Sequence, residues 1–219
     1  MAANPIETYG LGRMYMKDTR DNRFPATALL PAANLPLKDT SWRMEPPLQQ
    51  GNTPQCVDFS LRTCIMGSPT MQRSLKVQPG DIYTLARNLD EWPGESYDGT
   101  SVRAGEKAGV QLGLFEEYRW MTTIDDILQL LCYYGPVVIG SNWYYDMFHP
   151  DKTSTVHIGG GVAGGHAYCI CAYDDNKKRV RTLNTWGNTW GSNGRAWITV
   201  SDLERLLSES GEAALPVQK

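Results

Sequence analysis

A cysteine stands where a glycine-bearing loop gives way to a helical pattern. The loop covers residues 50–55, and apolar positions recur at helical spacing over residues 56–66. A thiol at a helix start, here Cys56, gains from the positive end of the helix dipole, which favours the thiolate. Gln50 lies six residues upstream and carries a side-chain amide that can donate to an oxyanion. The spacing predicts an acyl-transfer site, with a structural buried thiol as the alternative.

Two later motifs supply the other groups that such a site needs. His166 follows a pair of glycines and opens a strand-like run, and Asn184 opens the run Asn-Thr-Trp-Gly-Asn-Thr-Trp-Gly-Ser-Asn-Gly. With Gln50 and Cys56, these residues follow the order Gln, Cys, His, Asn. In that order and in the tryptophan-glycine run, the chain resembles the papain family of cysteine peptidases from about residue 35 to residue 200.

The chain also departs from the family's pattern near the cysteine. Val57 stands where an aromatic residue is usual, Asp58 where a small residue is usual, and Thr53 where secreted members have a disulfide cysteine. His166 is 110 residues and Asn184 is 128 residues beyond Cys56, whereas roughly 130–150 is typical. These separations imply that the loops between Cys56 and His166 are shorter than those typical of the family.

The resemblance implies a role for each of these side chains. Cys56 would be the nucleophile, and His166 would hold the thiolate in an ion pair and later protonate the leaving amine. Asn184 would orient the imidazole, and Trp186 would cover their hydrogen bond from water. Gln50 would donate to the oxyanion together with the backbone N–H of the cysteine.

Substrate-binding residues follow from the same resemblance. Gly99, Thr100 and Ser101 resemble the segment that pairs with an extended peptide backbone. Val102, Gly140 and Gly165 are expected to line the main specificity pocket, and Trp186 borders the cleft. These small residues predict a roomy pocket without indicating a preferred side chain.

Composition and charge exclude several other classes of function. The 219 residues carry a net charge of −3 with a pI of about 5.6, which argues against a nucleic-acid partner. No run approaches the roughly 18 apolar residues of a membrane span, and the first 20 residues lack the apolar core of a signal peptide. We therefore expect a cytoplasmic protein without a membrane partner, whose five cysteines are reduced.

No metal or other cofactor is expected. Cys169 and Cys171 alternate near His166, but zinc sites usually show wider cysteine spacing and a second ligand pair. Buried strand residues are the better interpretation.

The periodicity predicts helices first and strands later. Helices are expected over residues 56–66, from Gln78-Pro79 to about residue 89, over 101–112 and over 123–135. Strands are expected over residues 136–141, 166–173, 179–184 and 195–200, followed by a short helix that Ser201 caps. The fold class is α+β, with a helical lobe (about 45–125) facing an antiparallel sheet or barrel lobe (about 126–219), and the resemblance places the cleft between them.

Residues 1–34 show no clear period and predict an extended arm. We expect this arm to lie away from the cleft, because it is much shorter than the family's inhibitory segments. The whole is interpreted as a thiol endopeptidase of bacterial or bacteriophage type acting on peptides or proteins. An acyltransferase or isopeptidase on the same site, or a binding protein on an inactive scaffold, are the alternatives.

Overall fold

The computed structural model describes residues 5–30, 35–92 and 96–218. Helices α2 (Cys56–Met66), α3 (Asp81–Leu89) and α4 (Val102–Gln111) lie together on one side of a sheet. Helices α5 (Ile124–Tyr133) and α6 (Val200–Ser208) lie beside the other part of the sheet. Within the described residues, no helix has both the length and the apolar character that crossing a membrane requires.

The sheet has seven antiparallel strands and stays open. Its main order is β2-β7-β3-β4-β5-β6, and β1 pairs with β4 beside this path. Strands β3 and β4 form the longest pairing. The strands are β1 (Thr40–Ser41), β2 (Glu117–Met121), β3 (Val137–Tyr144), β4 (Val162–Asp174), β5 (Arg179–Leu183), β6 (Arg195–Thr199) and β7 (Glu212–Val217).

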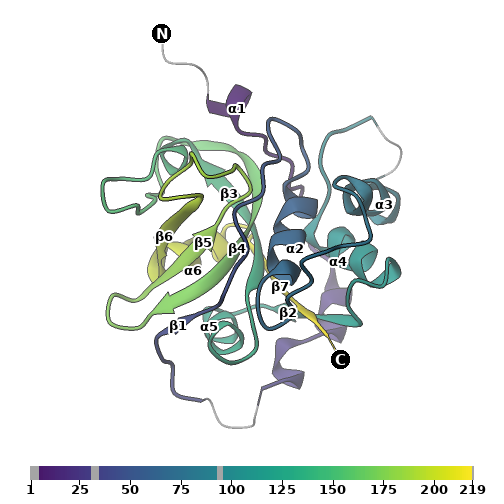
Figure 1. Cartoon of the computed structure of the whole chain (residues 1–219), viewed down its shortest axis with the longest axis horizontal. Coiled ribbons are helices and arrows are strands. Elements are labelled where there is room, and N and C mark those ends of the chain that lie inside the picture. The colour runs from purple at the N-terminus through teal and green to yellow at the C-terminus, as the bar shows by residue number, and fades with distance from the viewer. Residues whose placement is uncertain (1–4, 31–34, 93–95, 219) are drawn as a thin grey trace.

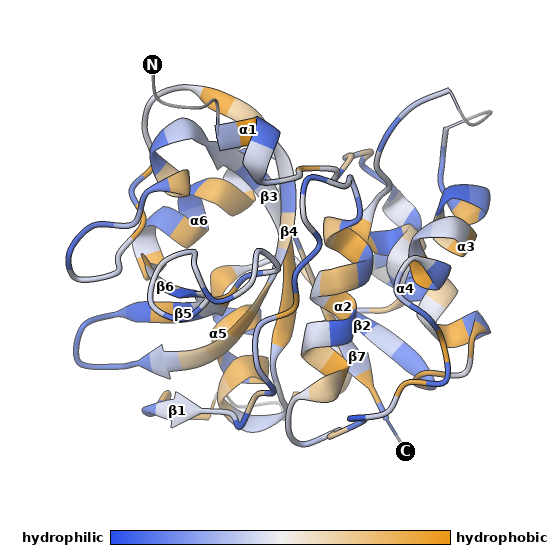
Figure 2. Ribbon diagram, turned by 45° about the horizontal axis from the view of Figure 1, so that its top comes forward, coloured by the Kyte–Doolittle hydropathy of each residue, from blue (hydrophilic) through white to orange (hydrophobic). Residues whose placement is uncertain are grey.

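Strand β4 separates two apolar cores. Successive strand residues point to opposite faces, so Ala167 and Cys169 join the core beneath α2 to α4, whereas Tyr168 and Ile170 join the core with α5 and α6. The apolar colouring of α2 and of the neighbouring strand β4 in Figure 2 follows this division. Helix α2 is therefore held directly against the strand that carries His166.

The predicted α+β class is confirmed, with several corrections to the elements. The sheet does not close into a barrel. Strands β2 and β7 were not predicted, and they pair with each other although about 90 residues of chain separate them. Helix α3 begins at Asp81, after Gln78-Pro79, and α6 is capped by Thr199, whose hydroxyl accepts from the backbone N–H of Asp202 at 3.0 Å, and not by Ser201.

The arm contradicts the prediction that it avoids the cleft. In its described part it forms α1 (Pro5–Thr8), η1 (Thr19–Arg23) and η2 (Ala26–Ala28); residues 1–4 and 31–34 lie outside the described residues. The purple segment in Figure 1 runs from α1 along the junction of sheet and helices to the vicinity of β2. The short segment between α1 and η1, which contains Gly10 and Gly12, crosses this junction of sheet and helices.

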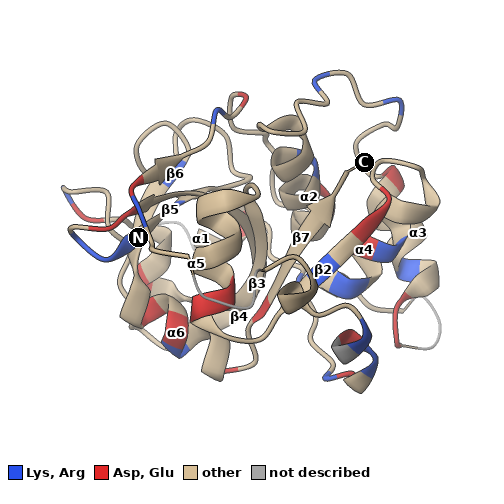
Figure 3. Ribbon diagram, turned by 90° about the horizontal axis from the view of Figure 1, so that it is seen from below, with Lys and Arg blue, Asp and Glu red and all other residues tan. Residues whose placement is uncertain are grey.

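A buried arginine fastens the arm beyond this crossing. The Nε of Arg103 donates to Asp21 at 2.6 Å, its Nη1 donates to Glu91 at 2.7 Å, and its Nη2 donates to the carbonyl of Met16 at 3.2 Å. Arg103 belongs to α4, on which Figure 3 marks both signs of charge. Because the guanidinium and its partners are largely buried, this cluster resists the screening that weakens surface ion pairs.

Candidate active site

His166 and Asn184 meet where β4 and the end of β5 lie side by side. His166 Nε2 and Asn184 Oδ1 are 2.8 Å apart, and His166 Nδ1 has no hydrogen-bond partner among the described residues. Trp186 stacks on the imidazole with ring centroids 4.3 Å apart, and Trp143 meets it edge-on at 4.9 Å. One ring nitrogen is thus fixed by the amide, and the other remains available for a proton transfer.

Cys56 is the first residue of α2 and is fully buried. Its thiol lies against the backbone N–H groups of Ala167, of Val57 and of its own residue. Ala167 directly follows His166 in β4, so the start of α2 lies against the part of the strand that carries the histidine. Both the thiol of Cys56 and the imidazole of His166 are fully buried there.

Burial disfavours the charged forms of both groups. Burial raises the pKa of the Cys56 thiol to about 12 and lowers the pKa of His166 to about 3, because neither charged form is solvated. The expected thiolate–imidazolium pair is therefore not the favoured state of the structure. Its formation would require water or substrate dipoles that the closed site excludes.

Gln50 reaches the same junction from the loop before α2. Its Nε2 donates to the carbonyl of Gly10 at 3.2 Å and to that of Thr53 at 2.8 Å, and its Oε1 accepts from the hydroxyl of Thr185. Trp186 Nε1 donates to the same Gly10 carbonyl at 3.1 Å. A carbonyl of the arm therefore takes one hydrogen bond from Gln50 Nε2, and the carbonyl of Thr53 in the loop takes the other.

The arm crosses the site as an extended chain held by backbone hydrogen bonds. Gly12 N donates to the carbonyl of Gly165 at 3.0 Å, and Gly12 O accepts from the N–H of Thr100 at 2.9 Å. Met14 N donates back to the carbonyl of Thr100 at 2.9 Å, and Gly10 N donates to that of Gly51 at 3.0 Å. Such pairing is how an extended peptide binds an exposed edge.

Two glycines allow the arm to pass the loop that precedes Cys56. A Cβ at Gly10 would lie 2.1 Å from the carbonyl oxygen of Thr53, and one at Gly12 would lie 2.2 Å from that of Pro54. Gly99 is similar on the opposite side, since its Cβ would lie 2.3 Å from the carbonyl oxygen of Gly12. Backbone cannot yield as a flexible side chain can, so this passage admits only glycine.

The remaining predicted substrate-binding residues have two different surroundings, the arm residue Arg13 for some and the start of α4 for another. A Cβ at Gly140 would meet Val102 at 2.6 Å and Arg13 Nε at 3.0 Å, so both residues border the Arg13 side chain. Ser101 caps α4 instead, because its hydroxyl accepts from Ala104 N at 3.1 Å.

Sequence reasoning missed the arm residues and an acid that one of them contacts. The pattern Gly10-Leu11-Gly12 was a usable signal, since alternating glycines in an otherwise irregular segment indicate close backbone approach. Glu212 gave no signal, because strand β7 was not predicted. Arg13 Nε donates to Glu212 Oε2 at 2.7 Å, and both side chains are 2% exposed.

The two departures beside the cysteine have structural explanations. Asp58 accepts from Arg62 and from the N–H groups of Gly80 at 2.9 Å and Tyr83 at 3.1 Å, so it anchors the start of α3. Val57 packs against α4, where a Cβ at Gly105 would lie 2.4 Å from its Cγ1. Neither residue intrudes on the hydrogen bonds of the histidine.

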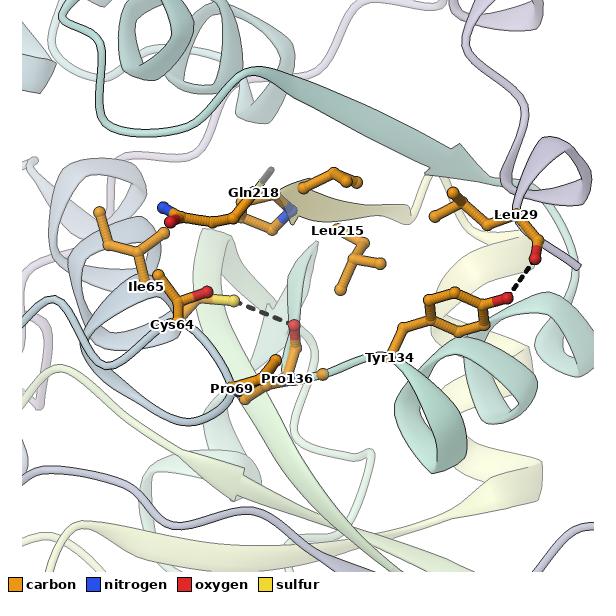
Figure 4. A pocket seen from close by; sticks show the side chains of 12 residues that line it. Leu29, Cys64, Ile65, Pro69, Tyr134, Pro136, Leu215 and Gln218 are labelled. Carbon is orange, nitrogen blue, oxygen red and sulfur yellow. Dashed lines mark hydrogen bonds between the residues drawn. The ribbon is translucent and has the colours of Figure 1, made fainter.

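A cavity of about 410 Å³ lies elsewhere, between the end of α2 and β7 (Figure 4). Apolar side chains such as Ile65 and Leu215 dominate its lining, and the thiol of Cys64 donates to the carbonyl of Pro136 at 3.0 Å. None of Gln50, Cys56, His166 and Asn184 lines it. Across the described residues, no cluster of His, Cys, Asp or Glu could hold a metal ion.

Solved structures with a similar architecture include cysteine proteases. The structure superposes on xylellain, a cysteine protease from Xylella fastidiosa, with a TM-score of 0.73 and 18% identity, covering 97% of this chain and 98% of that one. It superposes on the digestive procathepsin L2 proteinase of Tenebrio molitor with a TM-score of 0.64 and 17% identity, covering 97% and 79%. The chain therefore has the papain-like fold.

Local sequence similarity leads to the same class. The chain is 33% identical over 82 residues to an uncharacterized peptidase C1-like protein of Acanthamoeba polyphaga mimivirus, and 32% identical over 73 residues to cathepsin B-like cysteine proteinase 6 of Caenorhabditis elegans. These stretches span 26% and 19% of the two relatives. No family model matches the chain. The papain-like resemblance inferred from the sequence is confirmed.

Proposed function

We propose that the protein is a thiol peptidase that uses Cys56, His166, Asn184 and Gln50, and whose own arm closes its cleft. The observation that carries this proposal is the arrangement around His166. One ring nitrogen is 2.8 Å from Asn184, the other is unpaired and buried, and the cysteine-bearing helix start packs on the same strand. A structural thiol would not need a histidine held in this way.

The chemistry follows from these positions once the arm has left and a peptide has entered. The Cys56 sulfur gives its proton to His166 and attacks the carbonyl carbon, forming a C–S bond while the oxygen gains the negative charge. Gln50 and the backbone N–H of Cys56 donate to that oxygen. The imidazolium then protonates the departing amine as the C–N bond breaks, and water attacks the thioester to release the acid and restore the thiol.

Arm displacement provides the test of this function. A full-length Gly10→Ala/Gly12→Ala variant should hydrolyse unstructured peptides much faster than the natural sequence, because a Cβ at either position collides with loop backbone. Adding Cys56→Ala should abolish the reaction. A folded, opened variant that cleaves no peptide in a broad mixture would contradict the proposal, as would cleavage that survives Cys56→Ala. Amine transfer in place of hydrolysis would favour the acyltransferase alternative.

A further inference from the structure

A polar pocket of about 310 Å³ lies at the end of the sheet that β5 and β6 form, away from α3 and α4 (Figure 1). Arg181 of β5 and Arg195 of β6 line it, together with Ser41, Ser192 and Asn193. All five side chains can donate hydrogen bonds. None of the described residues that line the pocket is acidic, and none belongs to the four proposed catalytic residues. The pocket therefore offers donors and positive charge to a ligand.

The strand register places the two guanidinium groups on one face of the sheet. Arg181 pairs with Trp197 in the antiparallel ladder, and Arg195 lies two residues before Trp197 on β6. Alternate residues of a strand point to the same face, and diagonal neighbours of this kind are roughly 7–8 Å apart. An anion of a few atoms that enters the pocket can thus contact both arginines.

Neither of these two arginines has a countercharge in the described part of the chain. The neighbouring Arg179, by contrast, pairs with Asp174 at 3.0 Å. Asp39 borders Arg181 on its other side, but its carboxylate accepts from the backbone N–H of Asp175 at 2.7 Å and forms no ion pair with the arginine. Two like charges at this separation repel each other, so an anion between them would be stabilised by both.

The loop that completes the pocket is held in place by its own hydrogen bonds. Ser192 N donates to the carbonyl of Arg195 at 2.8 Å, and Arg195 Nη1 donates to the carbonyl of Asn193 at 2.9 Å. The hydroxyls of Ser41 and Ser192 and the amide of Asn193 have no hydrogen-bond partner among the described residues. Donors that are fixed before a ligand arrives lose little conformational entropy when it binds.

A buried thiol beside the pocket experiences the same positive charge. Cys171 lines the pocket from β4 and is 3% exposed. Burial raises the pKa of this thiol to about 11, whereas Arg195 and Arg181 both act to lower it. Both guanidinium groups therefore act on a single atom at the pocket.

We infer that this pocket binds a dianionic oxyanion, either free phosphate or the phosphate group of a small organic ester. Two guanidinium groups match the charge of a phosphate dianion, which a single carboxylate would only half neutralise. Their planar forks, with the hydroxyl and amide donors, can serve several phosphate oxygens at once. This site is independent of the proposed peptidase function.

Calorimetry on the natural full-length protein tests the inference. Inorganic phosphate is titrated at fixed ionic strength in a chloride buffer, and acetate and phosphoserine are titrated separately. Phosphate should bind saturably at one site, roughly tenfold or more tightly than acetate. Binding of phosphoserine as well would support recognition of an ester, and its failure to bind would support the free ion. No saturable binding of either phosphate compound, or equal binding of acetate, would overturn the inference.

Substitutions locate the site. Arg181→Gln and Arg195→Gln should each weaken phosphate binding roughly ten- to hundredfold, as expected for the loss of a charge-assisted hydrogen bond. Arg179→Gln is the matched control, because it removes a positive charge from the same strand. The Arg179 guanidinium pairs with Asp174, lies 4.0 Å from the centroid of a Trp197 ring, and does not line the pocket. Its variant should bind phosphate almost as tightly as the natural protein.

Two patterns among the variants would contradict the site. An equal loss in all three would show attraction to the general charge of this surface, and an unchanged affinity in both pocket variants would place phosphate elsewhere. Melting curves without phosphate establish that each variant folds. In addition, phosphate should raise the melting temperature of the natural protein and leave that of the folded pocket variants almost unchanged. If one pocket variant does not fold, the other decides.

Discussion

At the scale of single residues, burial favours the neutral forms of Cys56 and His166. Burial raises the pKa of Cys56 and lowers that of His166, so the closed protein favours thiol and imidazole over the ion pair. The backbone N–H of Ala167, the charge of Arg13 and the N–H groups of Val57 and Cys56 lower the pKa of the thiol but do not outweigh desolvation. If Cys56 and His166 act as proposed, admitting water or substrate would be enough to favour the ion pair.

Substitutions in the opened protein should reduce turnover in a definite order. Cys56→Ala should abolish it, and His166→Ala should come close, because the base and the proton donor are lost together. Gln50→Ala should cost about 10²–10³-fold, the usual effect of removing one oxyanion donor. Asn184→Ala should reduce turnover less than His166→Ala, because it removes only the group that orients the imidazole ring of His166. Peptide turnover and melting curves of each variant test this order; a fully active, folded His166→Ala would assign the base elsewhere.

The closed protein should lose stability in acid because of His166. The folded pKa of about 3 lies below the ordinary 6.5, so the unfolded chain binds the proton first and stability falls as pH drops from about 6.5 toward 3. Between pH 7 and pH 5 the loss should be about 2 kcal/mol. Urea unfolding of the natural protein and of His166→Asn at both values measures it.

The comparison with His166→Asn is needed because buried acids act oppositely. Burial raises the pKa of Glu106 to about 8 and of Glu212 to about 7, so their contributions improve as pH falls. Arg13 limits the shift of Glu212, and Arg103 and Asp21 also act on it. Only the difference between the two proteins reports on the imidazole. An identical pH dependence in both would show that the histidine is solvated in the folded state.

At the scale of elements, Asp58 couples helix α2 to its neighbour α3. Its carboxylate receives Arg62 within α2 and two N–H groups at the start of α3, so the position of one helix fixes the other. The family that the chain resembles usually has a small residue at this position. Its contacts instead explain it as a structural residue of this chain.

Removing Asp58 should therefore destabilise the protein strongly. Asp58→Ala leaves Arg62 buried without its countercharge, which should cost about 3–5 kcal/mol in unfolding free energy. Asp81→Ala is the control, because Asp81 also bonds a backbone N–H near the start of α3 but at an exposed position. Its cost should stay near 1 kcal/mol. Similar denaturant midpoints for both variants would show that the buried pair contributes little.

Local patterns predicted the helices and the central strands well, since each has its own period or cap. Strands β2 and β7 have no such independent mark, because their pairing joins segments distant in the chain. The ion pair between Arg13 and Glu212 has no local mark either, because it joins the arm to a strand near the other end of the sequence. Gln50, Cys56, His166 and Asn184 were proposed from residue types, spacing and family resemblance, and as a catalytic set they stay a prediction. The pKa values of Cys56 and His166 depend on burial in the folded chain, which no local pattern encodes.

At the scale of the whole molecule, the arm links both sides of the cleft. Its backbone bonds to Gly165 on the sheet side and to Thr100 at the start of α4, and Arg103 fastens the segment that follows. Expelling it should thus have opposite effects on stability and activity. In Gly10→Ala/Gly12→Ala the melting temperature should fall by several degrees while peptide turnover rises.

A neighbouring exposed position provides the control for that prediction. Lys17→Ala changes an exposed side chain of the same arm and should alter neither quantity appreciably. A rise in turnover of the same size in Lys17→Ala would mean that general loosening of the arm, and not the glycine passage, governs access. Unchanged turnover in the double glycine variant would mean that the arm does not block the cleft.

The central claim is that Cys56 is a nucleophile covered by the arm, and thiol labelling tests it most directly. The natural protein and the Gly10→Ala/Gly12→Ala variant are exposed at neutral pH to a peptidyl epoxide, and the modified residue is mapped by mass spectrometry. We predict slow labelling of the natural protein, much faster labelling of the opened variant, and modification of Cys56 alone among the five cysteines. Equal rates in the two proteins, or modification of another cysteine in its place, would contradict the account.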